Sequence, residues 1–261
     1  MKTSHNLSLP RKKQHQMSSD GNVQYPSGFS LKDLVGWGAN GLVVHDESNN
    51  TIIKTPFAEE NADHIAREKQ VYERFTERGG HKGILRYHGP YETGIRLDYA
   101  PNHNLRGLID EETSQQQRLD WACQIAEAVE FIHASGVIHG DMTCANIFVD
   151  EGLNAKVANF AGSSLDGSEF LIVVTASHAY PGELQSVRAD LFALGGILYE
   201  LMTGQPPYDG KEDEEIEELY KSHVFPDTES LGSVGRIITK CWQGGYADCK
   251  PIVEDLKGTI Q

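Results

Sequence analysis

The strongest chemical signal in this chain is a carboxylate and a carboxamide that lie five positions apart. Residues 138–149 read IHGDMTCANIFV, so Asp141 and Asn146 lie between two apolar runs. Asp141 could accept a proton or orient a hydroxyl group, and Asn146 could supply an oxygen to a magnesium ion. Both residue types also occur in ordinary turns, but a plain turn fits poorly with apolar runs on both sides. We therefore interpret this loop as a candidate catalytic and metal-binding loop.

A glycine-rich segment near the N-terminus could cover phosphate groups. Residues 36–43 read GWGANGLV, which places Gly36, Gly38 and Gly41 in a GxGxxG spacing that ends in Val43. Glycines allow a backbone to approach phosphates closely, although the pattern alone is weak because it also occurs in glycine-rich turns. A dinucleotide-binding fold needs a helix directly after the glycines. Here a second apolar strand follows, so the sequence favours a hairpin that lies over phosphates.

Two charged residues further along could serve the same site. Lys54 ends an apolar strand that begins at Thr51, and a lysine there can act as a point charge on phosphates. Glu68 lies inside a predicted helix over 59–78 and could orient Lys54 through a buried ion pair. Taken singly, each has a plainer interpretation: an edge-strand lysine that faces water and an exposed helix glutamate with an i,i+4 partner.

The elements that would position these residues change character near Pro101. Before it, apolar runs predict strands, with a hairpin around the polar turn 47–50 and two further strands near 84–88 and 94–99. Apolar periodicity and end signals predict helices over 59–78, 117–135, 186–203, 231–242 and 250–258, with a charged helix within 211–219. A β-rich front half and a helical back half indicate an α+β fold with two lobes, between which ligands commonly bind. We divide the chain into a disordered basic tail (1–27), a small lobe (28–100) and a larger lobe (101–261).

Composition limits the partners. Hydrophobic residues make up 39% of the 261 residues, enough for a sizeable core. The net charge of −15 argues against nucleic acid or an anionic membrane as the main partner. No stretch approaches the roughly 20 apolar residues that cross a bilayer, and residues 1–20 lack the apolar segment of a signal peptide. The 4 cysteines include no CxxC pair, so we expect an intracellular, cytoplasmic protein.

In this order, the motifs resemble the signature set of the protein kinase family. The resemblance covers most of the chain, from about Phe29 to the last predicted helix. It implies the two-lobed protein kinase fold, with a small β-rich lobe and a larger, mainly helical lobe. It also implies ATP and Mg²⁺ as ligands and transfer of the γ-phosphoryl group to a hydroxyl of a protein substrate. The segments HGDMTCAN and NFAGSSLDG are similar, in addition, to divergent kinase-like proteins of filamentous fungi.

The resemblance assigns a role to each candidate residue. Asp141 would be the catalytic carboxylate, Lys54 would hold phosphates, and Glu68 would pair with Lys54. The implied nucleotide-binding residues are Gly36, Gly38, Gly41, Val43, Lys54, Leu97, Asp98 and Ala100. Among these, Leu97 would be the gatekeeper beside adenine, and Asp98 and Ala100 would offer backbone groups. The implied metal ligands are Asn146 and Asn159, and Asp190 would begin the buried helix that braces the catalytic loop.

Four positions depart from the kinase pattern. Asn159 replaces the metal-binding aspartate, and a charge near 4 Å at an effective dielectric of 20 is worth about 4 kcal/mol. That is at most roughly three decades of rate. Gly140 replaces an arginine that binds an activation-segment phosphate, so we expect activation without loop phosphorylation. Thr143 replaces a lysine that contacts the transferred phosphate. Glu183 has no evident arginine partner, and Lys250 could take that place.

Two interpretations from different classes therefore remain. Intact glycines, Lys54, Glu68, Asp141 and Asn146 favour an enzyme with weakened activity. Asn159 and Thr143 favour an inactive pseudokinase that binds nucleotide or a protein partner. We favour the enzyme, because relaxed selection would erode the lysine and the catalytic aspartate as readily as residue 159.

Overall fold

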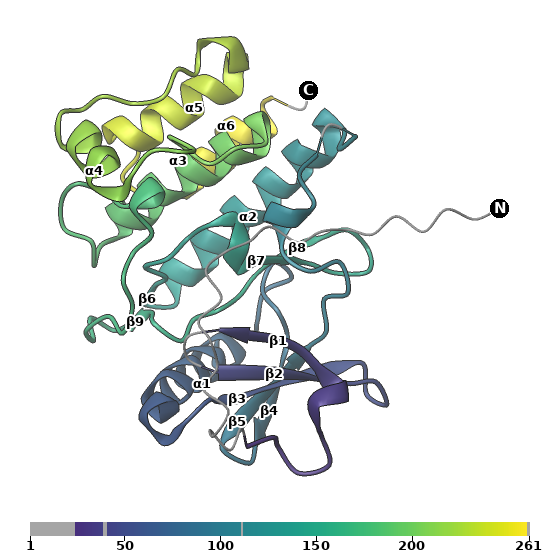
Figure 1. Ribbon diagram of the computed structural model, residues 1–261. Coiled ribbons are helices and arrows are strands. Elements are labelled where there is room, and N and C mark those ends of the chain that lie inside the picture. The colour runs from purple at the N-terminus through teal and green to yellow at the C-terminus, as the bar shows by residue number, and fades with distance from the viewer. Residues whose placement is uncertain (1–23, 39–40, 111, 260–261) are drawn as a thin grey trace.

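The computed structural model describes residues 24–38, 41–110 and 112–259. They form two parts: an antiparallel sheet with one long helix, and a larger helical part (Figure 1). The predicted α+β, two-lobed fold is confirmed. Most of the predicted tail lies outside the described residues, but its last residues are described and pack on the sheet. Tyr25 contacts the core of the small lobe, and the Tyr91 hydroxyl donates to the Ser27 carbonyl at 3.1 Å.

The small lobe is a five-stranded sheet in the order β1-β2-β3-β5-β4. Its strands are β1 (Leu34–Gly38), β2 (Gly41–Asp46), β3 (Thr51–Pro56), β4 (Tyr87–Tyr91) and β5 (Gly94–Asp98). Burial alternates along β2 and β3, because successive side chains point to opposite faces of a strand. The helix α1 (Ala62–Glu77) follows a short 3₁₀ turn, Glu59–Asn61, and packs on β3, β4 and β5. The strand predicted near 84–88 begins later, since Ile84 pairs with Val157 of another strand.

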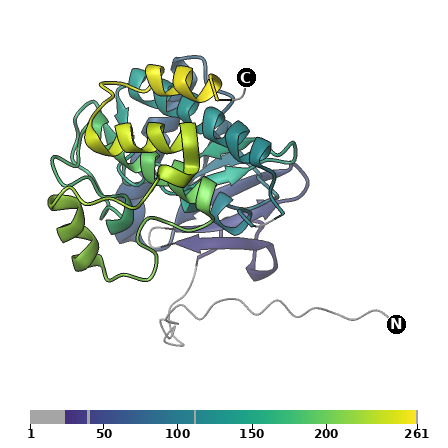
Figure 2. The ribbon, with the colours of Figure 1, turned by 90° about the horizontal axis from the view of Figure 1, so that it is seen from above.

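The larger lobe is built around the helix over Val187–Thr203, most of whose residues are buried. Its helices are α2 (Gln115–Ala134), α3 (Val187–Thr203), α4 (Asp213–Lys221), α5 (Gly232–Gln243) and α6 (Lys250–Lys257). Serine hydroxyls cap two of them: Ser114 accepts from Gln117 N on α2, and Ser186 accepts from Ala189 N on α3. Gly204, at φ 80°, ends α3 in the left-handed conformation that glycine adopts without strain. Seen from above, the yellow helices α5 and α6 lie on the near side of the molecule (Figure 2).

Four very short strands and several 3₁₀ turns lie within the loops near the boundary between the lobes. The strands are β6 (Val137–Ile138), β7 (Ile147–Val149), β8 (Ala155–Val157) and β9 (Ser164–Leu165), paired as β6-β9 and β7-β8. The 3₁₀ turns used below are η4 (Cys144–Asn146) and η5 (Ala176–His178). One hydrophobic cluster runs from α1 and β5 through α2 to α6 and joins the lobes. None of the described helices is both long and apolar enough to span a bilayer.

Candidate active site

One buried carboxylate ties three elements of the site together. Glu68, on α1, is fully buried, and its Oε2 lies 2.7 Å from Lys54 Nζ on β3. Its other oxygen accepts a hydrogen bond from the backbone N–H of Phe160 at 3.1 Å. A buried charge without a partner is strongly destabilising, so this pairing fixes α1 against the sheet. The ion pair that the resemblance implied is present, and the plainer interpretation of each residue as solvent-exposed is wrong.

Polar contacts continue from Lys54 to the loop that carries Asp141 and Asn146. Lys54 Nζ donates to Asn159 Oδ1 at 2.9 Å, and Asn159 Nδ2 donates to Asn146 Oδ1 at 2.9 Å. Asn146 Nδ2 then donates to Asp141 Oδ2 at 2.8 Å and to the Asp141 carbonyl at 2.7 Å. Asn159 has a φ of 67°, a left-handed conformation that asparagine tolerates better than most residues. The chain fold thus brings five separately predicted residues into one connected group.

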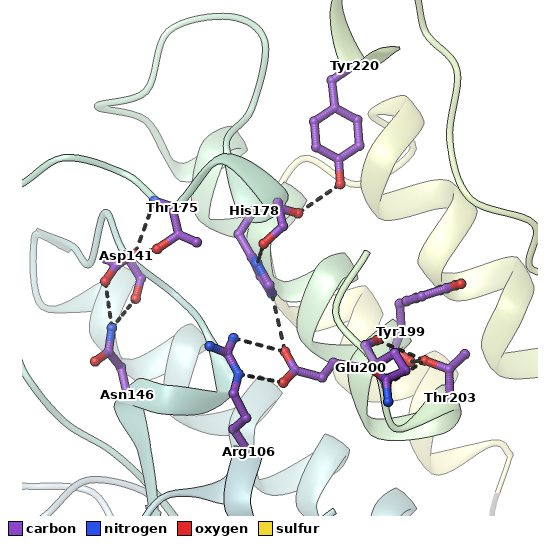
Figure 3. A network of polar contacts seen from close by, with 11 residues as sticks. Arg106, Asp141, Asn146, Thr175, His178, Tyr199, Glu200, Thr203 and Tyr220 are labelled. Atoms are coloured by element: carbon purple, nitrogen blue, oxygen red, sulfur yellow. Dashed lines mark hydrogen bonds and ion pairs between the residues drawn. The ribbon is translucent and has the colours of Figure 1, made fainter. Parts of the chain in front are cut away.

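The Asp141 carboxylate is held at both oxygens. Thr175 Oγ1 donates to Asp141 Oδ1 at 2.9 Å, and Figure 3 shows Thr175 and Asn146 on either side of this carboxylate. Behind the loop, buried Asp190 on α3 accepts backbone N–H bonds from His139 at 2.8 Å and Gly140 at 3.0 Å. These contacts fix the loop that carries Asp141, which is the bracing that the resemblance implied for Asp190.

The pKa of Asp190 reflects the same bracing. Burial by itself would raise the pKa of this carboxyl. The His133 hydrogen bond, the charges of His133 and His139, and the Gly140 N–H together hold it below its ordinary value. Asp190 is therefore ionised at neutral pH and accepts hydrogen bonds at both oxygens.

An aromatic column, which the sequence analysis did not identify, runs behind the polar chain. Phe160 is fully buried, and its ring centroid lies 5.0 Å from His139 and 5.4 Å from Tyr72. Tyr72 stacks on Tyr87 of β4 at 5.8 Å. The sequence analysis assigns no role to Tyr72. The relevant signal is that it lies four residues after Glu68 on the same helix face.

The nucleotide-binding candidates lie on the sheet face that meets the larger lobe. Val43 is directly opposite Lys54, and Ile52 is opposite Leu97, so these side chains share one face. That face meets the larger lobe, since Lys54 contacts Asn159. Leu97 is buried at the end of β5, followed by Asp98 at the strand end and by buried Ala100.

The three glycines differ in what packing requires of them. A Cβ at Gly41 would lie 2.4 Å from the Thr55 carbonyl oxygen, so packing within the sheet already demands glycine there. At Gly38 a Cβ would meet nothing within 4 Å, and at Gly36 it would meet only Val43 at 3.9 Å. Internal packing therefore does not require glycine at residues 36 and 38.

The comparisons with known proteins agree with this geometry. Residues 29–240 match the family model of the protein kinase domain. This chain belongs to the protein kinase family. It is 26% identical over 226 residues to the serine/threonine-protein kinase RUNKEL of Arabidopsis thaliana, a match that covers 80% of this chain and 16% of RUNKEL. The narrower resemblance to fungal proteins stays a prediction.

Two further relatives represent other branches of the family. The megakaryocyte-associated tyrosine-protein kinase of Mus musculus is 28% identical over 189 residues, which cover 67% of this chain and 37% of the relative. The serine/threonine-protein kinase PknB of Mycobacterium leprae is 26% identical over 232 residues, which cover 76% and 36%. This kinase domain thus spans well under half the length of these relatives, which include both serine/threonine and tyrosine kinases.

The position of the missing arginine is filled by an aromatic ring. Gly140 has a φ of 84°, and a Cβ there would lie 2.8 Å from the Phe170 ring. Phe170 belongs to the activation segment, 159–183, which folds back onto this glycine. An arginine side chain at residue 140 would collide with Phe170 where it now lies. The departure from the family pattern therefore has a structural counterpart.

The activation segment of this kinase domain is tied to α1. Arg67 donates to the carbonyls of Ser163 at 2.6 Å and Glu169 at 3.0 Å. Arg74 forms a bidentate ion pair with Asp166: Nη1 donates to Oδ1 at 3.0 Å and Nη2 donates to Oδ2 at 2.7 Å. The Arg74 hydrogen bond lowers the pKa of Asp166 and keeps it ionised. Two cations on one helix therefore hold the early part of the segment.

The expected substitute for the Glu183 partner is wrong. Among the described residues Glu183 forms no ion pair with Lys250: Glu183 is exposed just before α3, and Lys250 is exposed at the start of α6. A different ion pair lies beneath η5: Nε of Arg106, whose side chain is partly exposed, contacts Oε1 of buried Glu200 at 2.8 Å. His178 Nε2 lies 4.0 Å from Glu200 (Figure 3).

Two other reactive residue types near the site are held inert. Burial, and then the charge of Arg106, lower the pKa of His178 to about 3, so it is neutral and serves as no base at physiological pH. Burial raises the pKa of the Cys144 thiol well above its usual range, which removes the reactive thiolate.

Proposed function

We propose that this kinase domain binds ATP with Mg²⁺ between its lobes and transfers the γ-phosphoryl group to a protein hydroxyl, at a weakened rate. The observation that carries the proposal is the unbroken polar chain Glu68–Lys54–Asn159–Asn146–Asp141. It connects Lys54, a cation that can bind phosphates, with Asp141, a carboxylate that can accept a proton from a hydroxyl group. Membership of the kinase family supports phosphotransfer in general terms.

The donor atoms fit a nucleotide and one weakly held magnesium ion. Lys54 offers a cation whose side chain is 14% exposed, and Gly36 and Gly38 leave room for phosphates beneath β1 and β2. The metal ligands would be the carboxamide oxygens of Asn146 and Asn159, which are hard oxygen donors of the kind magnesium prefers. Within the described residues no cluster of three or more His, Cys, Asp or Glu could hold a metal. The site would therefore bind the metal with less protein charge than an aspartate supplies.

Each residue in the chain has a defined task. Bound ATP and Mg²⁺ would supply the phosphoryl group and the positive charge that neutralises it. Asp141 orients the substrate hydroxyl and accepts its proton, with Asn146 and Thr175 holding the carboxylate in place. Lys54, positioned by Glu68, offsets negative charge on the phosphates. Because this chemistry is mostly positioning, a weakened metal site lowers the rate without abolishing it.

A second function is favoured by one specific observation. Asn159 Oδ1 already accepts from Lys54, and Asn146 Oδ1 accepts from Asn159. Both candidate metal ligands are thus satisfied by the protein itself, as a nucleotide- or protein-binding pseudokinase without metal would require. A metal ion would have to use the second lone pair of each oxygen or replace these hydrogen bonds.

The deciding experiment is thermal unfolding with ATP, with and without Mg²⁺, followed by phosphotransfer with a general protein substrate. A ligand that binds only the folded state adds about 2.7 kcal/mol of stability at a hundred times its Kd. We expect a Mg²⁺-dependent rise in Tm and phosphate transfer that Asp141→Asn abolishes while the Tm rise persists. ATP binding without transfer would replace the enzyme by the pseudokinase. No shift under either condition would refute nucleotide binding.

A further inference from the structure

An arginine outside the polar chain lies beside the loop that carries Asp141 and Asn146. Arg106 belongs to the 3₁₀ turn η3 (Leu105–Gly107), which packs on η4, the turn that ends at Asn146. Figure 3 shows the Arg106 guanidinium between Glu200 on one side and Asp141 with Asn146 on the other. The hydrogen bond to Glu200 is the main cause that raises the pKa of Arg106, and the charge of Asp141 contributes too. Arg106 therefore borders the place where a substrate hydroxyl would meet Asp141.

The ion pair between Arg106 and Glu200 presents its cation outward. Arg106 Nε donates to Glu200 Oε1 at 2.8 Å, and Arg106 Nη2 donates to Glu200 Oε2 at 3.3 Å. The Glu200 side chain is 2% exposed, whereas the Arg106 side chain is 38% exposed. Among the described residues, the pair with Glu200 uses the Nε–Nη2 edge of the guanidinium and leaves the Nη1–Nη2 edge without a partner. That second edge can bind another carboxylate through two N–H bonds.

The other polar groups next to Glu200 are uncharged. His178 Nε2 lies 4.0 Å from Glu200 Oε2, and burial, followed by the charge of Arg106, lowers the pKa of His178 to about 3. Burial, followed by the charge of Glu200, raises the pKa of Cys144, so its thiol stays protonated. Arg106 is thus the cation that neutralises Glu200. With Arg106 in place, the Glu200 carboxylate is paired and buried, and it is closed to a basic side chain of a substrate.

We propose that Arg106 determines the charge specificity of the site: it selects a protein segment with a carboxylate side chain within two residues of the acceptor hydroxyl. The carboxylate pairs with the free edge of the guanidinium. A lysine or arginine at the same place in the substrate meets a like charge, which is unfavourable at a contact surface. The inference rests on the proposed function, because it names the substrate class of the same site.

The net charge of −15 acts against acidic segments only at longer range. Charges exposed to water are largely screened beyond about 8 Å at physiological ionic strength, whereas the pair with Arg106 is a direct contact. The overall charge slows the approach of an acidic segment. The direct contact decides which segment stays bound, so the selectivity belongs to Arg106 and not to the surface as a whole.

The test compares three peptides of about ten residues on the full chain. They are identical except for the two residues on each side of a central acceptor, which are glutamate, its neutral twin glutamine, or lysine. Each peptide is made with serine and with tyrosine as the acceptor. Fluorescence anisotropy gives the Kd, and transfer from ATP with Mg²⁺ gives kcat/KM. We expect the glutamate peptide to bind about tenfold more tightly than the lysine peptide, with the glutamine peptide between them.

Two substitutions should move this preference in opposite directions. Arg106→Gln removes the cation and opens Glu200 to the substrate, so the lysine peptide should become the tighter ligand. Glu200→Gln leaves the cation uncompensated, so the preference for glutamate should increase several-fold. The double variant carries neither charge and should bind the three peptides equally. Arg96→Gln is the matched control, because it breaks an ion pair with Asp46 in the small-lobe sheet; it should lower the Tm and leave the preference unchanged.

Binding and transfer separate this inference from the proposed function. Glutamate-selective binding without phosphate transfer would refute the enzyme and support the role of Arg106. Transfer to all three peptides with equal kcat/KM would support the enzyme and overturn the role of Arg106. That role would also be overturned by a parent protein that prefers the lysine peptide or binds none of the three. An Arg106→Gln variant with an unchanged preference would overturn it as well, since a loss of stability alone does not invert a preference.

Discussion

Restoring the missing charge at residue 159 tests the metal argument directly. In Asn159→Asp the contact with Lys54 survives, but the Nδ2 donor that bonds Asn146 at 2.9 Å is lost. Two oxygens then face each other, which costs about 1 kcal/mol for the lost bond and roughly 2–4 °C in Tm. Magnesium between these oxygens removes the repulsion. We therefore expect a lower Tm than the parent without Mg²⁺, and a larger Tm rise with Mg²⁺ and ATP.

The same substitution should raise turnover. A unit charge near 4 Å contributes about 4 kcal/mol at an effective dielectric of 20, which is an upper bound of roughly a thousandfold. Part of this attraction already acts in the ground state, through Lys54 and the metal, and only the transition-state excess accelerates the reaction. Ten- to a hundredfold is the expected gain in kcat.

The control places an equal charge elsewhere. Gln115→Glu adds a carboxylate at the exposed first turn of α2, far from the cleft, and should leave turnover and the Mg²⁺ response unchanged. If Asn159→Asp folds normally yet gains neither turnover nor a stronger Mg²⁺ response, residue 159 is not a Mg²⁺ ligand and the missing charge there does not limit the rate.

Three further changes probe other parts of the structure. Glu68→Gln leaves Lys54 without its buried partner and should cost about 3–5 kcal/mol in urea unfolding; a cost below 1 kcal/mol would contradict the bracing role. The pKa of His178 is lowered to about 3 in the folded protein, so below pH 6.5 the unfolded chain binds a proton that the folded chain does not. The free energy of unfolding therefore decreases as the pH is lowered from 6.5 to 3, by up to about 1.4 kcal/mol per pH unit. His178→Leu should flatten that slope in urea unfolding at pH 7, 6 and 5, and an unchanged slope would exclude His178 as its source. Finally, phosphatase treatment should leave turnover unchanged, whereas Phe170→Ala should lower the hydrogen-exchange protection of residues 163–172; a large loss of activity after phosphatase would contradict activation without phosphate.

The sequence predicted the elements that depend on local pattern. The helix α1 was expected over 59–78 and occupies Ala62–Glu77, because its apolar spacing and its glycine stop are both local signals. The ends of α3 follow from Ser186 and Gly204 in the same way. The strand near 84–88 was misplaced, since the backbone of Ile84 pairs across the lobes with Val157, which no local pattern encodes.

The site was predictable as a set of residues but not as a set of contacts. Motif order identified Lys54, Glu68 and Asp141 as candidates, yet nothing local shows that Asn159 and Asn146 bond to each other. The aromatic column was missed for the same reason, because Tyr72 and Tyr87 of the small lobe meet Phe160 and His139 only when the lobes pack together. Pairing Glu183 with Lys250 failed because it assumed proximity from a family pattern that this chain does not follow.

The activation segment shows how one lost residue is compensated by others. Where the family uses an arginine to hold a phosphate, this chain places the Phe170 ring on Gly140 and holds the segment from α1 through Arg67 and Arg74. The helix that bears these arginines also bears Glu68, the partner of Lys54. The order of the segment and the position of Lys54 therefore both depend on the position of α1. A shift of α1 would therefore disturb the Lys54–Glu68 pair and the Arg67 and Arg74 contacts together.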